Sequence, residues 1–360
     1  MYKILLEFIN FIYSLRFVDI IKKTFCFTLI TIIFISSITL YEDISVLASE
    51  QVVVVIDPGH GGENLGTNYL PVPEKFYNME VALHMKEQLE NYQNIKVYLT
   101  HEEDIDMSLQ ERADFAQSVE ADFLISLHFN MSLSHELYGS EVWIPSTGTL
   151  YSQGYSMANE FINQFEEMGL FNRGIKTRIG TNNTDYYGII RHCSVRNIPA
   201  IIVEHCHVDN KNDIDNLASD KLKEFGIRNA EAVARYYGLT SKDNDKDYSD
   251  YAPVAIPIPA GKVYNDTTSP DIANVSLISC SKSRRYATVT LTAQDYDTNI
   301  QYYAYSYDNG FTWSSYFPWQ KGKNNMTITV IMPYCKKDSL IFKVTNLYDL
   351  VSKSNSIALK

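Results

Sequence analysis

Residues 52–62 read VVVVIDPGHGG, and this stretch decides the fold of the region around it. Its first five residues form a continuous β-branched run, as expected for a strand that is buried on both faces. Similar apolar runs occur at Ile95–Leu99, Phe123–Leu127 and Ala200–Val203, and amphipathic helical patterns lie between them. Strands that alternate with helices predict an α/β domain with a largely parallel sheet flanked by helices.

Two of the helical patterns have clear boundaries. Ser108 and Glu111 have the spacing of a capping box, in which each residue binds a backbone N–H of the other. Gly238 ends the last pattern, and a glycine is the usual residue after a helix. We therefore expect a helix to begin after Ser108 and another to end at Gly238.

The composition changes after Thr240. Residues 241–264 begin with the charged run SKDNDKDYSD and continue with three prolines, which predicts an extended linker. Residues 265–360 have no helical period, Ala287–Ala293 alternate apolar side chains with threonines, and Asp308-Asn309-Gly310 is a hairpin turn signal. We predict a separate β-sandwich there, which loosely resembles the immunoglobulin-like modules of bacterial cell-surface proteins.

The N-terminal residues 1–48 have the pattern of an export signal. Lys3, Arg16, Lys22 and Lys23 precede the apolar run Thr24–Leu40, and small residues suited to cleavage end at Ala48. The run is short for a membrane span, which favours a signal peptide over an uncleaved membrane anchor. Either interpretation predicts that the rest of the chain is exported, as a secreted protein in the first case and as a membrane-tethered protein in the second.

Charge and cysteine content exclude some classes of protein. The chain has 31 Lys+Arg against 43 Asp+Glu, a net charge of −12, which disfavours nucleic-acid binding. No two of the five cysteines have the C-x-x-C spacing of zinc knuckles or thioredoxin-like proteins. Cys280 and Cys335 fall in the same predicted domain, where they would form a disulfide or remain buried thiols.

Two histidines follow buried strands. His60 lies in the glycine-rich loop after the first strand, and His128 follows Phe123–Leu127. Parallel strands place both imidazoles at the same sheet edge, where open α/β sheets bind ligands. A single loop histidine would usually be a solvated turn residue. Two at one edge suggest a catalytic zinc site, which takes three ligands from histidine and carboxylate side chains and leaves a position for water.

Three glutamates are candidates for the remaining roles. Glu74 opens the first helical pattern, which favours it as a ligand over Glu80 inside that pattern, although the residues alone leave both open. Glu204 follows the apolar run Ala200–Val203, and an acid in such a place needs a partner. It is either a general base beside the metal or half of a structural salt bridge.

Taken together, these motifs resemble the zinc-dependent N-acetylmuramoyl-L-alanine amidases of the Amidase_3 type. The resemblance covers roughly residues 52–240. The motifs match in order: Ile56–Gly62, Glu74-Lys75-x-x-Asn78, Leu109–Arg112, Ala121–Asn130, Arg173–Lys176 and Pro199–Glu204. Each motif alone is weak, but the ordered set is highly specific.

The resemblance implies a function for residues 49–240. It implies that His60, Glu74 and His128 bind Zn²⁺ and that Glu204 is the catalytic carboxylate. The implied reaction is hydrolysis, by zinc-activated water, of the amide between N-acetylmuramic acid and L-alanine in peptidoglycan, as in an autolysin. We expect Asp57 and Asn130 to orient the imidazoles. Arg112 would support the fold, with binding of a peptide carboxylate as the alternative.

The sequence departs from the family after Glu204, where a Gly-Phe pair is usual and His205-Cys206-His207 stands instead. We expect the two imidazoles to point to opposite sides of this extended stretch. We interpret them as a changed strand edge, with a metal or substrate role as the alternative. Thr100-His101 is a second departure, because an arginine is common after the threonine, and it concerns local loop contacts alone.

Two rival functions remain at this point. One is another zinc-dependent cell-wall hydrolase, either a stem peptidase or a deacetylase, and the other is a non-catalytic cell-wall-binding protein. The β-sandwich would bind glycan through Trp313 and Trp319 or act as a spacer, although tryptophan in such a core is more often buried. We expect the chain to be a monomer whose partner is peptidoglycan.

Overall fold

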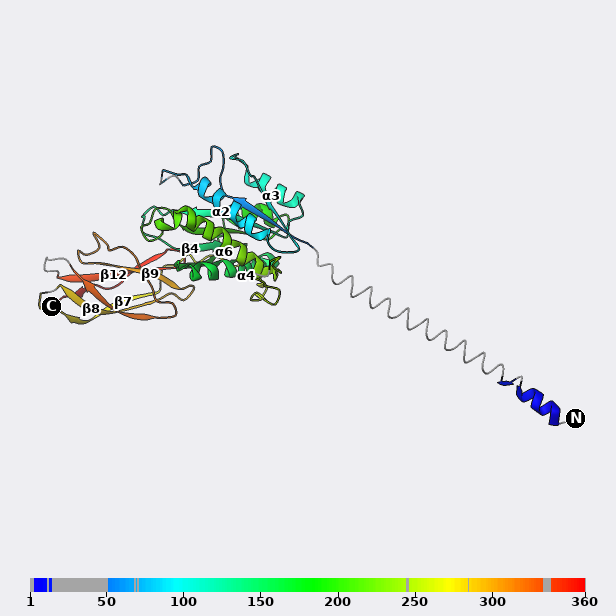
Figure 1. The fold of residues 1–360 in the computed structure, drawn as a ribbon. Helices are drawn as coiled ribbons and strands as arrows, with labels where there is room; N and C mark the ends of the chain where they lie inside the picture. The colour runs from blue at the N-terminus through cyan, green and yellow to red at the C-terminus, as the bar shows by residue number, and fades with distance from the viewer. Residues whose placement is uncertain are drawn as a thin grey trace. The chain divides into compact units, whose positions relative to one another are not determined.

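The computed structural model describes residues 3–11, 13–14, 51–67, 69, 71–243, 246–283, 285–332 and 338–359. It consists of two compact units, Met1–Gln51 and Val52–Lys360. In the first unit, residues 3–11 form a helix with exposed side chains, drawn in blue in Figure 1. Among the helices within these ranges, none has the length and apolar character needed to cross a membrane. The predicted export signal at Thr24–Ala48 lies outside the described residues.

The second unit begins with a six-stranded sheet in the order β2-β1-β3-β6-β4-β5. Its strands are β1 (Val52–Pro58), β2 (Ile95–Leu99), β3 (Phe123–Asn130), β4 (Ser140–Trp143), β5 (Asn172–Lys176) and β6 (Ala200–His207). Neighbouring strands are parallel, except that β4 runs antiparallel to β6. The predicted α/β domain with a largely parallel sheet is therefore confirmed.

Helices cover both faces of this sheet (Figure 1). Side chains of α2 (Glu74–Leu89), α4 (Gly148–Glu167) and α6 (Ser219–Tyr237) form the core on one face. Side chains of α3 (Leu109–Ser118) and α5 (Gly188–Ser194) form the core on the other face. A short 3₁₀ helix, η1 (Ile214–Leu217), precedes α6.

The valine run of β1 is explained by these two cores. Val54 and Ile56 belong to the core beneath α2 and α6, whereas Val55 belongs to the core beneath α3 and α5. Because successive side chains of a strand point to opposite faces, both faces of β1 must be apolar. Each of these side chains stabilises the fold by about 1.5–3 kcal/mol through burial.

The predicted helix boundaries are confirmed at both positions. The Ser108 side chain accepts a hydrogen bond from the backbone N–H of Glu111, and the Glu111 carboxylate accepts one from Ser108 N–H. Gly238 ends α6 in the left-handed conformation with φ 61°. A residue with a Cβ would be strained there, which is why glycine ends the helix.

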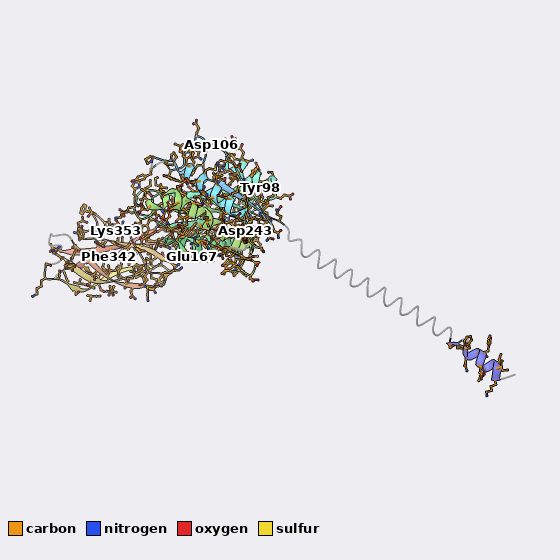
Figure 2. The ribbon with its side chains drawn as sticks, in the orientation of Figure 1. Tyr98, Asp106, Glu167, Asp243, Phe342 and Lys353 are labelled. Atoms are coloured by element: carbon orange, nitrogen blue, oxygen red, sulfur yellow. The ribbon has the colours of Figure 1, made fainter. Side chains whose placement is uncertain are left out.

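The C-terminal residues form two antiparallel sheets. One contains β10 (Phe317–Pro318), β9 (Ile300–Ser306), β12 (Ser339–Asn346) and β13 (Val351–Lys353), and β14 (Ile357–Ala358) pairs with β12. The other contains β11 (Asn325–Ile331), β8 (Tyr286–Gln294) and β7 (Ile272–Cys280). Side chains from both sheets, such as Phe342 in Figure 2, share one apolar core. A separate all-β region at the C-terminus is therefore confirmed.

The tryptophans of the β-region are poorly placed to stack on a sugar. Trp319 is 5% exposed, and its indole N–H is bonded to the Lys323 carbonyl. Trp313 is half-buried, with the ammonium groups of Lys343 and Lys353 against its ring. The Cys280 thiol is free, and Cys335 lies outside the described residues.

Residues 241–264 contain neither a helix nor a strand in their described parts, 241–243 and 246–264. The segment nevertheless contacts the α/β domain along its length. Tyr251 donates a hydrogen bond to Glu160 of α4, the Val254 carbonyl accepts one from Ser156, and Val263 N–H donates one to the Ser146 carbonyl. These contacts hold the segment against the surface of the α/β domain.

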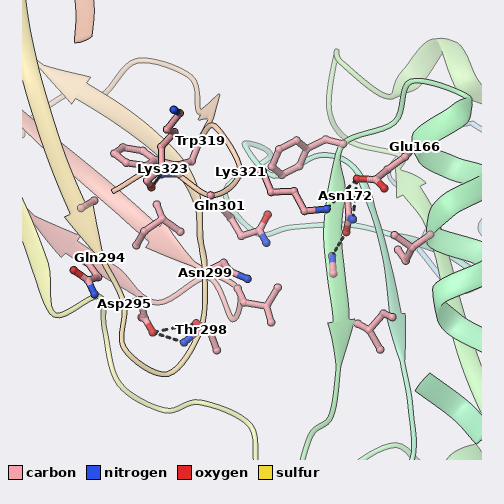
Figure 3. Close-up of a pocket in the computed structure, with 18 of the residues that line it drawn as sticks. Glu166, Asn172, Gln294, Asp295, Thr298, Asn299, Gln301, Trp319, Lys321 and Lys323 are labelled. Atoms are coloured by element: carbon pink, nitrogen blue, oxygen red, sulfur yellow. Dashed lines mark hydrogen bonds and ion pairs between the residues drawn. The ribbon is translucent and has the colours of Figure 1, made fainter. Parts of the chain in front are cut away.

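A cavity of about 520 Å³ lies between α4 and β5 on one side and the C-terminal β-region on the other (Figure 3). Polar side chains predominate among the labelled residues, including Asn172, Asn299 and Gln301, and Trp319 forms part of the wall. The lining includes neither His60 nor His128, so this cavity is distinct from the histidine site described next.

Candidate metal centre

His60, Glu74 and His128 come together at one edge of the sheet. His60 follows β1, Glu74 is the first residue of α2, and His128 lies near the end of β3. Their potential ligand atoms all lie within 4.8 Å of one another. One Glu74 oxygen is 3.2 Å from His60 Nε2 and the other is 3.0 Å from His128 Nδ1. Two imidazoles and a carboxylate form the kind of donor set that catalytic zinc sites use.

The competing glutamate lies elsewhere. Glu80 is six residues further along α2, where its carboxylate accepts a hydrogen bond of 2.5 Å from the Ser219 hydroxyl. It does not belong to the group of potential ligands. The geometry therefore favours Glu74 over Glu80.

Several hydrogen bonds fix the Glu74 carboxylate. It accepts hydrogen bonds from the backbone N–H groups of Thr67 (2.8 Å) and Phe129 (3.1 Å). Asn78, one turn further along α2, donates to the Gly59 carbonyl at 3.0 Å, which connects the helix to the loop that carries His60. The helix start, the β1 loop and β3 are thereby held in one arrangement.

Asn64 orients the other histidine. Its Oδ1 lies 2.9 Å from His60 Nδ1 and so can hold the ring with the opposite nitrogen directed at Glu74. Such partners set the tautomer and orientation of ligating imidazoles. Our sequence analysis missed Asn64, although a carboxamide four residues after a candidate ligand in the same glycine-rich loop was a usable signal.

Two glycines allow the side chains to approach so closely. A Cβ added to Gly59 would lie 2.2 Å from the His128 ring, and one added to Gly66 would lie 2.5 Å from both Glu74 and His60. Gly66 also has φ +69°, a conformation that favours glycine. His60 itself is left-handed, with φ 71°. The loop is therefore shaped around the three side chains.

Hydrogen bonds and charges within this group shift the pKa values of Glu74 and His60. Burial alone would raise the pKa of Glu74, but hydrogen bonds and positive charge from His128 and His60 lower it far below its ordinary value. Burial alone would lower the pKa of His60, but the hydrogen bond and negative charge of Glu74 raise it. The carboxylate is thus held ionised between two nitrogen donors, which suits a divalent cation.

Glu204 lies beside this group. It is opposite His128 in the β3–β6 ladder and opposite Glu141 in the β6–β4 ladder. Its buried Oε2 has no hydrogen-bond partner among the described residues. Burial and the nearby charges of Glu74 and Glu141 raise the pKa of Glu204 well above its ordinary value. An unpartnered buried carboxyl oxygen is costly, and a bound cation or substrate would relieve that cost.

Glu141 forms a second, fully paired acidic centre that the sequence analysis did not identify. It accepts hydrogen bonds from Arg173 Nε at 2.9 Å, Lys176 Nζ at 2.6 Å and Asn130 Nδ2 at 2.9 Å. Burial would raise the pKa of Glu141, but Lys176 and Arg173 lower it far below its ordinary value. An acidic residue directly before the apolar pair Val142-Trp143 of β4 was the available sequence signal.

Arg112 supports the loop that carries His60. The guanidinium donates to the Asp57 carboxylate at 2.7 Å, to the Pro58 carbonyl at 2.8 Å and to the His60 carbonyl at 2.7 Å. Asp57 also accepts hydrogen bonds from the hydroxyl groups of Thr100 and Ser126. These contacts agree with the structural interpretation of Arg112. Asp57 thus hydrogen-bonds to Arg112, Thr100 and Ser126, and Asn130 hydrogen-bonds to Glu141. Both bind these groups rather than the histidine rings, contrary to our expectation.

His205 and His207 lie in different surroundings because β6 carries an extra residue. His128 of β3 pairs with Glu204 of β6, and Asn130 pairs with His207. The step is two residues in β3 and three residues in β6, so β6 contains one extra residue there. A regular strand would place residues two apart on the same face, and the bulge is what separates them. Neither residue belongs to the group of potential metal ligands.

Each of these imidazoles has its own partners. His205 contacts the rings of Phe129 and Phe225 and hydrogen-bonds to Asn229, and burial lowers its pKa to about 4. His207 Nδ1 hydrogen-bonds to the Gly139 carbonyl at 3.2 Å. These environments agree with the interpretation of a changed strand edge.

Comparison with known proteins identifies the same family as the sequence motifs. A sequence model of the N-acetylmuramoyl-L-alanine amidases (Amidase_3) matches residues 54–235. The amidase CwlM of Bacillus licheniformis is 30% identical over 192 residues, which cover 52% of this chain and 70% of that protein. A putative amidase of Buchnera aphidicola from Schizaphis graminum is 31% identical over 134 residues, which cover 37% of this chain and 56% of that protein.

Among solved structures, the catalytic domain of CwlV from Paenibacillus polymyxa is similar, with 27% identity and a TM-score of 0.45. The match covers 52% of this chain and 98% of that domain. Cwp6 from Clostridium difficile has 31% identity and a TM-score of 0.48, over 55% of this chain and 30% of that protein. With about half of its residues matched by the family model, the chain belongs to the N-acetylmuramoyl-L-alanine amidase family, Amidase_3.

Proposed function

We propose that the chain is a zinc-dependent peptidoglycan hydrolase that cleaves the amide between N-acetylmuramic acid and L-alanine. The observation that supports this most strongly is the clustering of His60, Glu74 and His128 beside the unpartnered carboxyl of Glu204, in a member of this family. Residues 49–240 would form the catalytic domain, residues 241–264 the linker and residues 265–360 the β-module.

His60, Glu74 and His128 would hold the zinc ion. When bound, zinc supplies Lewis-acid chemistry, which activates water and polarises the scissile carbonyl. The donor set has the composition of a three-ligand catalytic site with a position left for water. Asn64 and the backbone N–H groups of Thr67 and Phe129 keep the ligands oriented.

Glu204 would move the proton. Its Oε2 accepts the proton of the attacking water and later passes it to the amine of L-alanine, which leaves as the amide breaks. Its oxygen is buried, and this burial together with the nearby charges of Glu74 and Glu141 raises the pKa of the carboxyl, which makes it a stronger base. Arg173 and Lys176 neutralise Glu141, so that it does not compete for the proton.

The test is mass spectrometry of products released from purified sacculi by the zinc-loaded protein. The expected products carry a new L-alanine amino terminus while the glycan remains uncut. A stem peptidase would cut between amino acids, and a deacetylase would release acetate; either result would refute the assignment. Glu204→Gln should retain zinc and lose cleavage, whereas Glu80→Gln, on the same domain, should cleave normally.

We propose that the protein acts as a monomer on peptidoglycan outside the cytoplasm, either secreted or tethered by residues 1–48. The N-acetylmuramoyl-L-alanine amidases among its relatives support the substrate.

A further inference from the structure

A loop of the C-terminal β-region reaches the acidic centre of the α/β domain. Residues 347–350 join β12 to β13, and three successive residues of this loop contact β5 or the residue that follows it. Leu347 Cδ1 lies 2.5 Å from where a Gly174 Cβ would be. The Tyr348 hydroxyl accepts a hydrogen bond from Thr177 N–H at 3.3 Å, and the Asp349 carboxylate accepts one from Arg173 at 2.8 Å.

The conformation of this loop is fixed from inside the β-region. Asn346 is fully buried, and its side-chain oxygen accepts hydrogen bonds from the backbone N–H groups of Tyr348 and Leu350. Its amide group donates to Asp266 and Asp295. Asp349 has φ 63°. The loop is therefore preorganised to present the Asp349 carboxylate.

A second residue of the β-region holds the same arginine. Tyr302 of β9 is fully buried, its hydroxyl accepts a hydrogen bond from Arg173 NH1 at 3.2 Å, and it donates one to the Tyr138 carbonyl. Arg173 is itself 2% exposed. Its guanidinium thus has one carboxylate from β4, one carboxylate from the loop and one hydroxyl from β9.

The contacts continue from Arg173 to the proposed active site. Arg173 Nε donates to Glu141, and Glu141 accepts from Asn130, which lies two residues after His128 in β3. Glu141 is also directly opposite Glu204 in the sheet. A change in the position of Arg173 would therefore be transmitted to the strands that carry His128 and Glu204.

Charge balance gives Asp349 a specific role. The cluster contains the buried carboxylate of Glu141, the partly exposed carboxylate of Asp349 and two buried cations, Arg173 and Lys176. Without the Asp349 charge, two cations would share one carboxylate in a buried setting. Leaving a buried charge without its partner is strongly unfavourable, so the cluster would rearrange.

We propose that Asp349 and Tyr302 are positioning residues for amide hydrolysis, and that the β-region is part of the catalytic unit. This inference rests on the proposed function. The β-region would hold Arg173, and through it Glu141, so that β4, β3 and β6 keep the geometry of the active edge. A wall-binding module or a spacer would make no such contribution.

The experiment measures kcat and KM of the full-length protein on a soluble muramoyl peptide that lacks a glycan strand. Asp349→Asn should lower kcat about tenfold, the lower end of the range for residues that support metal sites, with KM within about twofold. Tyr302→Phe removes one hydrogen bond and no charge, so it should lower kcat measurably but less than Asp349→Asn does. Zinc content should stay at the wild-type level in both variants. Tyr303→Phe on the same strand and Asp297→Asn at an exposed site are the matched controls.

The outcomes separate the inference from the proposed function. If the wild type cleaves the soluble substrate and both variants have the wild-type kcat, the inference is refuted and the proposed function is not. Variants that lose activity on sacculi but not on the soluble substrate also refute it, because they indicate wall binding. If Asp349→Asn does not fold, the kcat of Tyr302→Phe decides the question. A wild-type protein that cleaves no muramoyl amide refutes the proposed function, and the inference with it.

Discussion

His207 should make the protein sensitive to mild acid. The imidazole is 1% exposed, and burial, reinforced by the positive charge of Arg173, lowers its pKa to about 3. The Asp213 carboxylate lies 3.8 Å from the ring, but it accepts hydrogen bonds from the backbone N–H groups of Gly139 and His207. His207 is therefore neutral in the folded protein over the ordinary pH range.

The sign and size of the effect follow from linkage. Below pH 6.5 the unfolded chain takes up a proton at His207 and the folded chain does not, so stability is lost as the pH falls. At pH 5 the unfolded imidazole is 1.5 pH units below its ordinary pKa, which corresponds to about 2 kcal/mol at 1.36 kcal/mol per unit. The result is insensitive to the folded pKa, provided that it lies well below 5.

The assay is equilibrium unfolding in guanidinium chloride at pH 7 and pH 5, with a chelator present so that metal binding does not contribute. His207→Gln should be less stable than the wild type at pH 7, because a buried hydrogen bond is changed. The difference should then shrink by about 2 kcal/mol at pH 5. The partly exposed His192→Gln should show no such change. If His207→Gln and the wild type lose the same stability between the two pH values, His207 is protonated in the folded state and the reasoning is wrong.

Three further predictions concern the metal centre and its support. Gly59→Ala should displace the His128 ring, which would lie 2.2 Å from the new Cβ, and metal analysis should show weaker zinc binding. Glu74→Gln should reduce zinc content while the far-ultraviolet circular dichroism spectrum is unchanged; full zinc occupancy would contradict its assignment as a ligand. Arg112→Met leaves the buried Asp57 carboxylate without its ionic partner and should lower the free energy of unfolding by about 3–5 kcal/mol in chemical denaturation. An effect below about 1 kcal/mol would show that Asp57 finds other partners.

The sequence predicted those parts of the fold and site that follow from local patterns. The β1 run shows its burial on both faces directly, and strand-end placement brings His60 and His128 to one edge. The choice of Glu74 as a ligand required further evidence, because Glu80 on the same helix is equally acidic and helical periodicity alone does not distinguish the two. The family motif resolved that choice before the geometry did.

Other features depend on contacts that a single sequence does not encode locally. We expected His205 and His207 on opposite sides of their strand, but a regular strand places residues two apart on the same face. The extra residue in β6 is what separates them, and nothing in His205-Cys206-His207 marks that bulge. The partners of Arg173 include Asp349, 176 residues away, which only the packing of the β-region brings close. The sequence analysis therefore treated the β-region as a module joined by a linker and gave it no part in the catalytic edge.

The buried acids at this edge differ in a way that bears on mechanism. Asp57 is paired with Arg112, Glu141 with Arg173 and Lys176, and Glu74 with two imidazoles. Glu204 alone among these four keeps a buried oxygen without a hydrogen-bond partner in the described part of the chain. Because a folded protein usually satisfies such groups, an exception beside a metal-type donor set suggests a group kept for the reaction. In the proposed function, the carboxyl that the fold leaves unpaired is the one that takes the proton from water.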